Sequence, residues 1–172
     1  MKPLLSAEQI DEGVSRLAAE ISVFYAGRPL TILGVLNGSI VLVADLIRRM
    51  DLPLRVGLVQ VSSYRGPSPA PEPPQFDLSS TPDVQGRDVL LVDDIFDTGH
   101  TLSGLVERLR QAGPQSVRTA VLLRKHGRRA VSLVPDHVGF EIPNQFVVGY
   151  GLDYRDAYRN LPYVAVIEVD EG

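Results

Sequence analysis

Residues 89–101 read Val-Leu-Leu-Val-Asp-Asp-Ile-Phe-Asp-Thr-Gly-His-Thr, and this stretch decides the fold. Its first residues are wholly apolar, which predicts a strand over residues 89–92 that is buried on both faces. Carboxylates follow the strand, and a turn rich in glycine and hydroxyl groups then leads into the helical pattern of residues 101–111. The order of strand, acidic turn and helix is typical of an α/β sheet that binds ligands at the carboxyl ends of its strands.

The remaining sequence continues this alternation. Ser6-Ala7-Glu8-Gln9 matches a capping box, and apolar residues at helical spacing predict a helix to about Tyr25, with Pro29 ending it. A second helix is predicted over residues 40–50. Short apolar runs predict strands over residues 31–36, 55–62, 117–123, 146–150 and 164–169. The fold class is therefore α/β, with a mainly parallel sheet flanked by helices.

Composition favours a protein that acts on a small molecule. A chain of 172 residues with 44% hydrophobic residues fits one domain over residues 1–172. The net charge of −4 provides no basic field for nucleic acid, and no stretch approaches the ~20 apolar residues of a membrane span. The absence of cysteine excludes disulfides and thiolate chemistry. The first residues lack the apolar core of a secretory signal, so we expect a cytoplasmic protein.

A proline-rich segment interrupts the pattern. Prolines recur between Arg65 and Asp83 among few apolar residues, so this segment should form no packed element. We expect a long exposed loop over about residues 63–83. Such a loop is either a lid over a site or a disordered insertion.

The turn after the central strand predicts a phosphate site. Backbone N–H groups at a helix start are unpaired and partly positive, so Thr98, Gly99 and Thr101, with His100 between them, would hold a phosphate monoester. Asp93 and Asp94 suit ribose hydroxyls or the water around a metal ion, because ionised carboxylates only accept hydrogen bonds. Asp97 could accept a proton from a heterocycle above the sugar. The other interpretation is that these aspartates are helix caps or solvated loop residues.

These residues resemble the phosphoribosyl pyrophosphate (PRPP) motif of the type I phosphoribosyltransferases. The resemblance implies a twisted, mainly parallel sheet with a small hood and a flexible lid loop. Adenine- and orotate-type members usually carry alanine at the place of Asp97, whereas 6-oxopurine members carry aspartate. The resemblance therefore implies a Mg²⁺-dependent purine-salvage transferase that uses PRPP and hypoxanthine or guanine, with Asp97 and Lys125 as catalytic residues.

Two segments resemble the family's pyrophosphate site. Leu36-Asn37-Gly38-Ser39 is similar to the loop in which a peptide bond often turns cis, so that backbone N–H groups point at the diphosphate. Ser62-Ser63-Tyr64 is similar to the start of the flexible catalytic loop. An ordinary Asn-Gly turn and the frayed end of a strand are the alternative interpretations. The implied pyrophosphate ligands are Leu36, Asn37, Gly38, Ser63, Tyr64 and Arg159.

The purine site is implied by three further segments. Leu122-Leu123-Arg124-Lys125 resembles the strand end that supplies a lysine. That ammonium can donate to the O6 of hypoxanthine or guanine but cannot accept from the amino group of adenine. The match over residues 135–143 and 146–154 implies that Phe146 stacks on the purine. The implied purine ligands are Ile95, Lys125, Phe146, Val147 and Asp153, and the implied metal ligands are Asp93, Asp94 and Asp153.

The sequence departs from the family at three places. Asp93 replaces the usual glutamate, His100 stands where lysine is common, and the lid is rich in proline instead of glycine and serine. A xanthine-preferring enzyme and a nucleic-acid-binding regulator with the same fold are the alternative functions. Nevertheless Asp97, Lys125, Asp153 and Arg159 together favour an enzyme. The family resemblance also predicts a homodimer or homotetramer.

Overall fold

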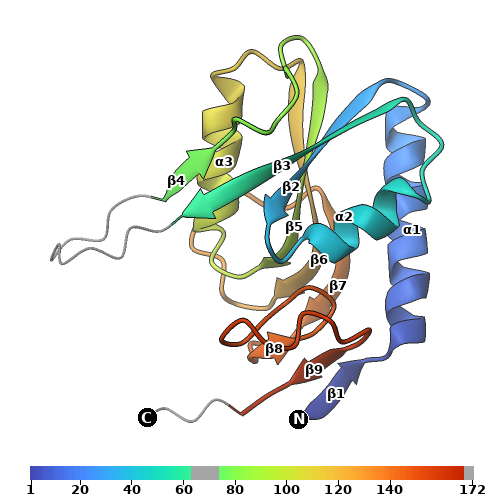
Figure 1. Cartoon of the computed structure of the whole chain (residues 1–172), viewed down its shortest axis with the longest axis vertical. Coiled ribbons are helices and arrows are strands. Elements are labelled where there is room, and N and C mark those ends of the chain that lie inside the picture. The colour runs from blue at the N-terminus through green and yellow to red at the C-terminus, as the bar shows by residue number, and fades with distance from the viewer. Residues whose placement is uncertain (63–73, 169–172) are drawn as a thin grey trace, which may run out of the picture.

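The computed structural model describes residues 1–62 and 74–168, and its centre is a six-stranded sheet (Figure 1). The strand order is β4-β3-β2-β5-β6-β7, and all neighbours are parallel except β3 and β4. The strands are β2 (Leu30–Leu36), β3 (Leu54–Ser62), β4 (Gln75–Asp77), β5 (Asp88–Phe96), β6 (Ser116–Lys125) and β7 (His137–Ile142). The predicted α/β class with a mainly parallel sheet is confirmed.

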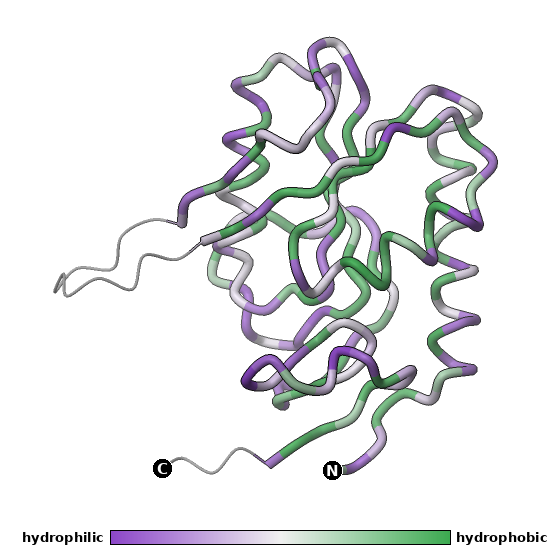
Figure 2. The backbone as a smooth tube through the Cα atoms, viewed as in Figure 1, coloured by the Kyte–Doolittle hydropathy of each residue, from purple (hydrophilic) through white to green (hydrophobic). Residues whose placement is uncertain are grey.

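Helices cover both faces of this sheet. α1 (Ala7–Tyr25) and α2 (Ile40–Ile47) pack with Leu90 and Val92 of β5 on one face. α3 (His100–Arg110) packs with Val89 and Leu91 on the other face. Successive residues of β5 are all apolar because they point alternately into the two hydrophobic cores, one on each face of the sheet. Figure 2 shows hydrophobic and hydrophilic residues alternating within the turns of α1, as expected for a helix that is buried on one side.

The predicted capping box starts α1 as expected. The Gln9 backbone N–H donates to Ser6 Oγ across 3.2 Å, and the Ser6 N–H donates to Gln9 Oε1 across 2.8 Å. The helix ends at its C-cap Ala26, where φ is 49°, so it stops before Pro29 is reached. α2 is shorter than predicted and ends at Ile47.

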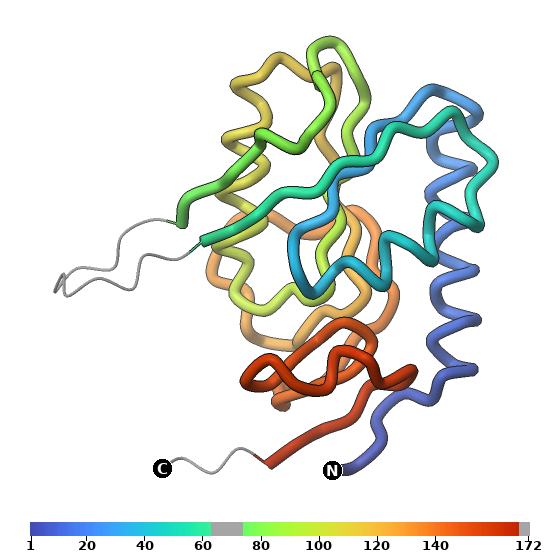
Figure 3. Tube along the Cα trace, viewed as in Figure 1, coloured from blue at the N-terminus to red at the C-terminus, as the bar shows by residue number. Residues whose placement is uncertain are grey.

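A second, three-stranded sheet forms the small hood. Its order is β1-β9-β8, antiparallel throughout, with β1 (Lys2–Leu5), β9 (Val164–Val166) and β8 (Val147–Val148). The strands predicted over residues 146–150 and 164–169 are thus shorter than expected, with residues beyond 168 outside the described part. In Figure 3 the blue N-terminal segment lies beside the red segment near the C-terminus, because β1 pairs with β9.

One expectation about the proline-rich segment is wrong. Residues 75–77 form the edge strand β4, which pairs with β3 so that Phe76 faces Val61. Phe76 also packs against the core on the α3 face. Pairing with the edge of β3 and packing of the Phe76 ring stabilise this short strand. Residues 63–73 lie outside the described residues, so the predicted lid is only partly described.

No helix within the described residues is both long enough and apolar enough to cross a bilayer.

Candidate active site

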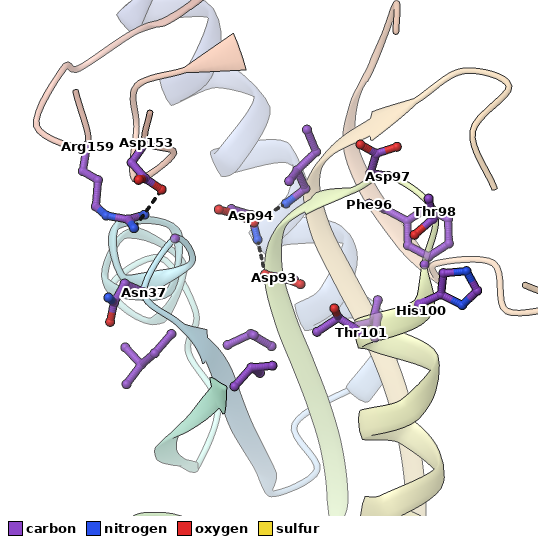
Figure 4. Close-up of a pocket in the computed structure, with 17 residues that line it drawn as sticks. Asn37, Asp93, Asp94, Phe96, Asp97, Thr98, His100, Thr101, Asp153 and Arg159 are labelled. Carbon is purple, nitrogen blue, oxygen red and sulfur yellow. Dashed lines mark hydrogen bonds and ion pairs between the residues drawn. The ribbon is translucent and has the colours of Figure 1, made fainter. Parts of the chain in front are cut away.

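A cleft of about 370 Å³ opens at the carboxyl ends of β2 and β5, beneath the hood. Figure 4 shows its lining side chains, which come from four parts of the chain: the end of β2 with the loop after it, Val61 of β3, the end of β5 with the start of α3, and the connection between β8 and β9 in the hood. The structure brings together in this cleft the predicted residues Leu36, Asn37, Gly38, Asp93, Asp94, Ile95, Asp97, Thr98, Gly99, His100, Thr101, Asp153 and Arg159.

The phosphate turn joins β5 to α3. Gly99 is the N-cap of α3, and no side chain caps the helix there. The first backbone N–H groups of α3 therefore have no side-chain acceptor among the described residues, and because residues 98–102 line the cleft these groups are available to an anion. Thr98 and Thr101 line the cleft beside them, and the side chain of His100 is exposed.

Asp93 and Asp94 form an acidic pair on the cleft floor. Asp93 Oδ1 accepts from the Asp94 N–H across 2.9 Å, and Asp94 Oδ1 accepts from the Ile95 N–H across 2.7 Å. Burial raises the pKa of Asp93 well above its ordinary value, and repulsion from Asp94 raises it further. Burial likewise raises the pKa of Asp94. Desolvated carboxylates that repel each other are suited to a cation or to hydroxyl donors in the cleft.

The loop after β2 lies directly against this pair. The peptide bond between Leu36 and Asn37 is cis, as the family resemblance predicts. Gly38 follows, and a Cβ atom there would lie 1.7 Å from Asp94 Oδ2. No other residue type can bring the loop so close to the carboxylate. The predicted pyrophosphate loop therefore lies directly beside the acidic pair.

Asp97 is held between two cations at the rim. Its Oδ2 lies 3.1 Å from Lys125 Nζ, and its Oδ1 accepts from Arg128 Nε across 2.8 Å. Burial raises the pKa of Asp97, but the hydrogen bonds from Arg128 and Lys125 outweigh it and hold the pKa below its ordinary value. Sequence reasoning missed Arg128, because it stands among several exposed basic residues.

An adjoining pocket of about 260 Å³ gathers the predicted purine residues. It shares Asp94, Ile95, Asp97 and Asp153 with the cleft. Lys125, Phe146 and Val147 complete it, together with Leu152, which the sequence analysis did not identify. Phe146 is 43% exposed, so its ring is open to a stacking partner instead of lying in the core.

Arg159 closes the hood side of the cleft. Its Nη2 lies 2.8 Å from Asp153 Oδ1, and its Nη1 donates to the Gly151 carbonyl across 2.7 Å. Figure 4 shows this pair facing Asp94 across the cleft. The other two predicted pyrophosphate ligands, Ser63 and Tyr64, lie outside the described residues.

The donor set fits a magnesium ion that is bound mainly through water and substrate. Among residues 1–62 and 74–168, no group of three or more His, Cys, Asp or Glu side chains is arranged to hold a metal ion. Mg²⁺ needs no such cage, because it usually binds one or two carboxylates and completes its shell with water and phosphate oxygens. The repelling pair Asp93 and Asp94 suits this mode of binding.

The sequence is similar to those of known phosphoribosyltransferases. Residues 3–155 match the family described as phosphoribosyl transferase domain. The chain is 40% identical over 167 residues to a hypoxanthine-guanine phosphoribosyltransferase of Streptococcus pneumoniae, an alignment that covers 97% of this chain and 93% of the relative.

Solved structures give the same result. A hypoxanthine-guanine phosphoribosyltransferase of Bacillus anthracis superposes with a TM-score of 0.91 at 34% identity, covering 98% of this chain and 99% of the other. A hypoxanthine phosphoribosyltransferase of Trypanosoma cruzi, solved as a ternary substrates complex, gives a TM-score of 0.90 at 36% identity, covering 97% and 95%.

Proposed function

The chain belongs to the phosphoribosyltransferase family and is a hypoxanthine-guanine phosphoribosyltransferase of purine salvage, and we propose that the cleft described above binds PRPP and Mg²⁺ while the adjoining pocket binds the purine. The enzyme forms IMP from hypoxanthine and GMP from guanine. One observation carries the assignment of the site. The phosphate turn and the acidic pair line the cleft, the Asp97–Lys125 pair lines the adjoining pocket, and Asp94, Ile95, Asp97 and Asp153 line both.

We assign the 5′-phosphate of PRPP to the start of α3. The unpaired N–H groups of residues 98–101 and the hydroxyls of Thr98 and Thr101 would donate to its oxygens. Asp93 and Asp94 would then accept from the ribose hydroxyls. Because Asp93 is one methylene shorter than the family's usual glutamate, we expect its ribose contact to be made through water.

The diphosphate of PRPP is assigned to the opposite wall. The backbone of Asn37 and Gly38 and the guanidinium of Arg159 line that wall. Asp93, Asp94 and Asp153 would hold magnesium there with water and substrate oxygens. Magnesium, when bound, neutralises the leaving diphosphate.

The purine would lie against Phe146, with its O6 facing Lys125 Nζ. The side chain of Lys125 is 12% exposed, so its ammonium would be largely desolvated when the base covers it. A desolvated donor without an acceptor is costly, which is why adenine, with an amino group at that position, should be rejected. The backbone of Val147 would read the neighbouring edge of the base.

The chemical step would be a displacement at the anomeric carbon. The purine N9 forms a bond to C1 of the ribose, and the bond from C1 to the diphosphate oxygen breaks with its electron pair leaving on the diphosphate. The proton lost by the imidazole ring of the purine passes to Asp97 through N7. The carboxylates beside the ribose stabilise the positive charge that develops on the ring.

A homodimer or homotetramer is expected from the family resemblance. Xanthine is the competing base, because it also carries an O6 acceptor.

A base panel tests the proposed function. Purified protein is mixed with PRPP, Mg²⁺ and hypoxanthine, guanine, xanthine or adenine in turn, and nucleotide formation is followed by chromatography. We expect IMP and GMP, no AMP, and no product when EDTA replaces Mg²⁺. Formation of xanthosine monophosphate alone would reassign the enzyme to xanthine, and no product from any base would refute the proposal.

A further inference from the structure

Tyr150 lies in the connection between β8 and β9 that also carries Asp153 and Arg159, and it has no role in the site described so far. Its side chain is 7% exposed and does not line the cleft. The hydroxyl donates to Asp45 Oδ2 of α2 across 2.5 Å. Burial and the hydrogen bond to Asp45 raise the pKa of Tyr150 above its ordinary value, so the hydroxyl remains a donor throughout the physiological range.

The segment around Tyr150 has an unusual backbone. φ is 97° at Gly149, 50° at Tyr150 and 98° at Gly151. The backbone N–H of Tyr150 donates to the Leu161 carbonyl across 2.8 Å, and that of Gly151 donates to the Arg159 carbonyl across 3.0 Å. A non-glycine residue is uncommon at positive φ, so the conformation of Tyr150 needs external support. The hydrogen bond to Asp45 supplies a contact of that kind.

Gly151 touches both halves of the predicted pyrophosphate site. On one side, a Cβ atom at Gly151 would lie 2.1 Å from the Gly38 carbonyl oxygen, so the hood segment is pressed against the loop after β2. On the other side, the Gly151 carbonyl accepts from Arg159 Nη1 across 2.7 Å. A displacement of Gly151 would therefore move the loop and the guanidinium relative to each other.

Asp45 is well placed to hold this segment. It lies on α2, which begins directly after the loop that contains Gly38. Asp45 Oδ1 faces Arg48 and Arg49 in the turn that directly follows α2, and this leaves Oδ2 directed at Tyr150. The Tyr150–Asp45 bond thus ties the helix that follows the loop to the hood segment that carries Arg159.

We propose that Tyr150 and Asp45 are positioning residues for pyrophosphate recognition, which keep the Asn37–Gly38 backbone and the Arg159 guanidinium aimed at one diphosphate. Neither residue touches the substrate. This inference rests on the proposed function, because it assigns the diphosphate to the wall formed by residues 36–38 and 159.

Steady-state kinetics of Tyr150→Phe and Asp45→Ala test the inference. A hydrogen bond to a charged group is worth about 1.5–3 kcal/mol, which limits the effect to roughly 10- to 150-fold. We expect KM for PRPP and the inhibition constant of inorganic pyrophosphate to rise about 5- to 30-fold, with KM for hypoxanthine changed less than about 2-fold. Asp45→Asn keeps an acceptor for the hydroxyl and should give a smaller rise than Asp45→Ala.

A double variant separates positioning from general damage. If both residues act through one bond, Tyr150→Phe combined with Asp45→Ala should raise KM for PRPP no more than either change alone. Equal increases in KM for PRPP and for hypoxanthine would indicate a loss of structure and would overturn the inference. Unchanged KM for PRPP in Tyr150→Phe or in Asp45→Ala would overturn it as well.

Two matched controls complete the design. Tyr25→Phe removes a buried hydroxyl that has no hydrogen-bond partner among the described residues. Arg48→Gln removes an exposed partner of Asp45 without touching Tyr150. Both should leave KM for PRPP unchanged. Wild-type protein that forms no nucleotide in the base panel would refute the proposed function itself, whereas active wild type with unaffected variants refutes only the role of Tyr150 and Asp45.

Discussion

Arg128 Nε donates to Asp97 Oδ1 across 2.8 Å, on the side of the carboxylate that Lys125 does not occupy. When a purine draws Lys125 toward its O6, Arg128 would remain as the cation that keeps Asp97 ionised. Both side chains are partly exposed, at 43% for Arg128 and 36% for Asp97, so water screens the pair and its effect is moderate.

The first prediction concerns the pH dependence that this pair sets. Asp97 accepts a proton only when it is ionised, and its lowered pKa extends that range toward acid. Arg128→Gln removes a cation and raises the pKa of Asp97, so the acid limb of kcat/KM for hypoxanthine should move to higher pH. The variant then loses activity relative to wild type as the pH falls. Arg124→Gln, whose arginine pairs with Glu141, is the control, and a limb that stays in place would contradict the assignment.

Replacement of the proposed base should affect turnover. Asp97→Asn keeps the size of the side chain but cannot accept the purine proton, so kcat should fall by roughly 10²–10⁴-fold. Binding of PRPP, measured by calorimetry, should change far less, because the phosphate turn and acidic pair are intact. Turnover equal to that of wild type would show that Asp97 is not the general base.

Lys125 should determine recognition of the oxo group. Lys125→Met keeps the length of the side chain without a donor, and kcat/KM for hypoxanthine and guanine should fall about 10- to 100-fold, the scale of a lost charged hydrogen bond. Lys125→Gln retains a donor and should lose less. KM for PRPP should hardly change in either variant. An equal loss in the two variants would argue against hydrogen bonding to O6.

The contact between Gly38 and Asp94 gives a steric prediction. In Gly38→Ala the added methyl group would overlap the Asp94 carboxylate, since the Cβ position lies 1.7 Å from Oδ2. Either the loop or the carboxylate must move, and both belong to the proposed PRPP site. We expect kcat/KM for PRPP to fall at least 10-fold. In the control Gly86→Ala, φ is 67° and an added Cβ has no neighbour within 4 Å, so the change strains only a turn that does not line the cleft and should leave kcat/KM within a few-fold of wild type. A fully active Gly38→Ala enzyme would contradict the position of the loop.

The fold was predictable where local signals and burial agree. The capping box at Ser6 and the apolar run of β5 are visible in the sequence, because a helix start and a doubly buried strand each have a local pattern. β1 and β4 were missed. These two strands are three or four residues long and exist because β9 and β3 offer edges to pair with, a condition that no local pattern records. The six-residue strand β7 was not predicted either, and it forms along the free edge of β6.

The candidate site was likewise predictable where its residues are close in sequence and not where they are distant. The acidic trio and the phosphate turn occupy one continuous stretch, so the sequence places them together. Arg128 and Tyr150 acquire partners only through tertiary structure, and Tyr150 lies 105 residues from Asp45 along the chain. A tyrosine in an apolar segment and an arginine in a basic segment carry no functional signal of their own. Their roles can be inferred only from the partners that the folded chain brings to them.

The last prediction concerns stability and Tyr25, whose hydroxyl is buried without a hydrogen-bond partner among the described residues. Tyr25→Phe removes this desolvated group, so the free energy of unfolding at neutral pH should be unchanged or increase by about 1 kcal/mol. Burial, with repulsion from Asp88, raises the pKa of Tyr25 from 10.0 to about 12. Between these two pH values the unfolded tyrosine ionises while the folded one keeps its proton, and wild type therefore loses stability as the pH rises. Phenylalanine cannot ionise, so the stability advantage of Tyr25→Phe should widen through this range in urea denaturation. An advantage that stays constant or shrinks with rising pH would show that the hydroxyl is solvated in the folded protein.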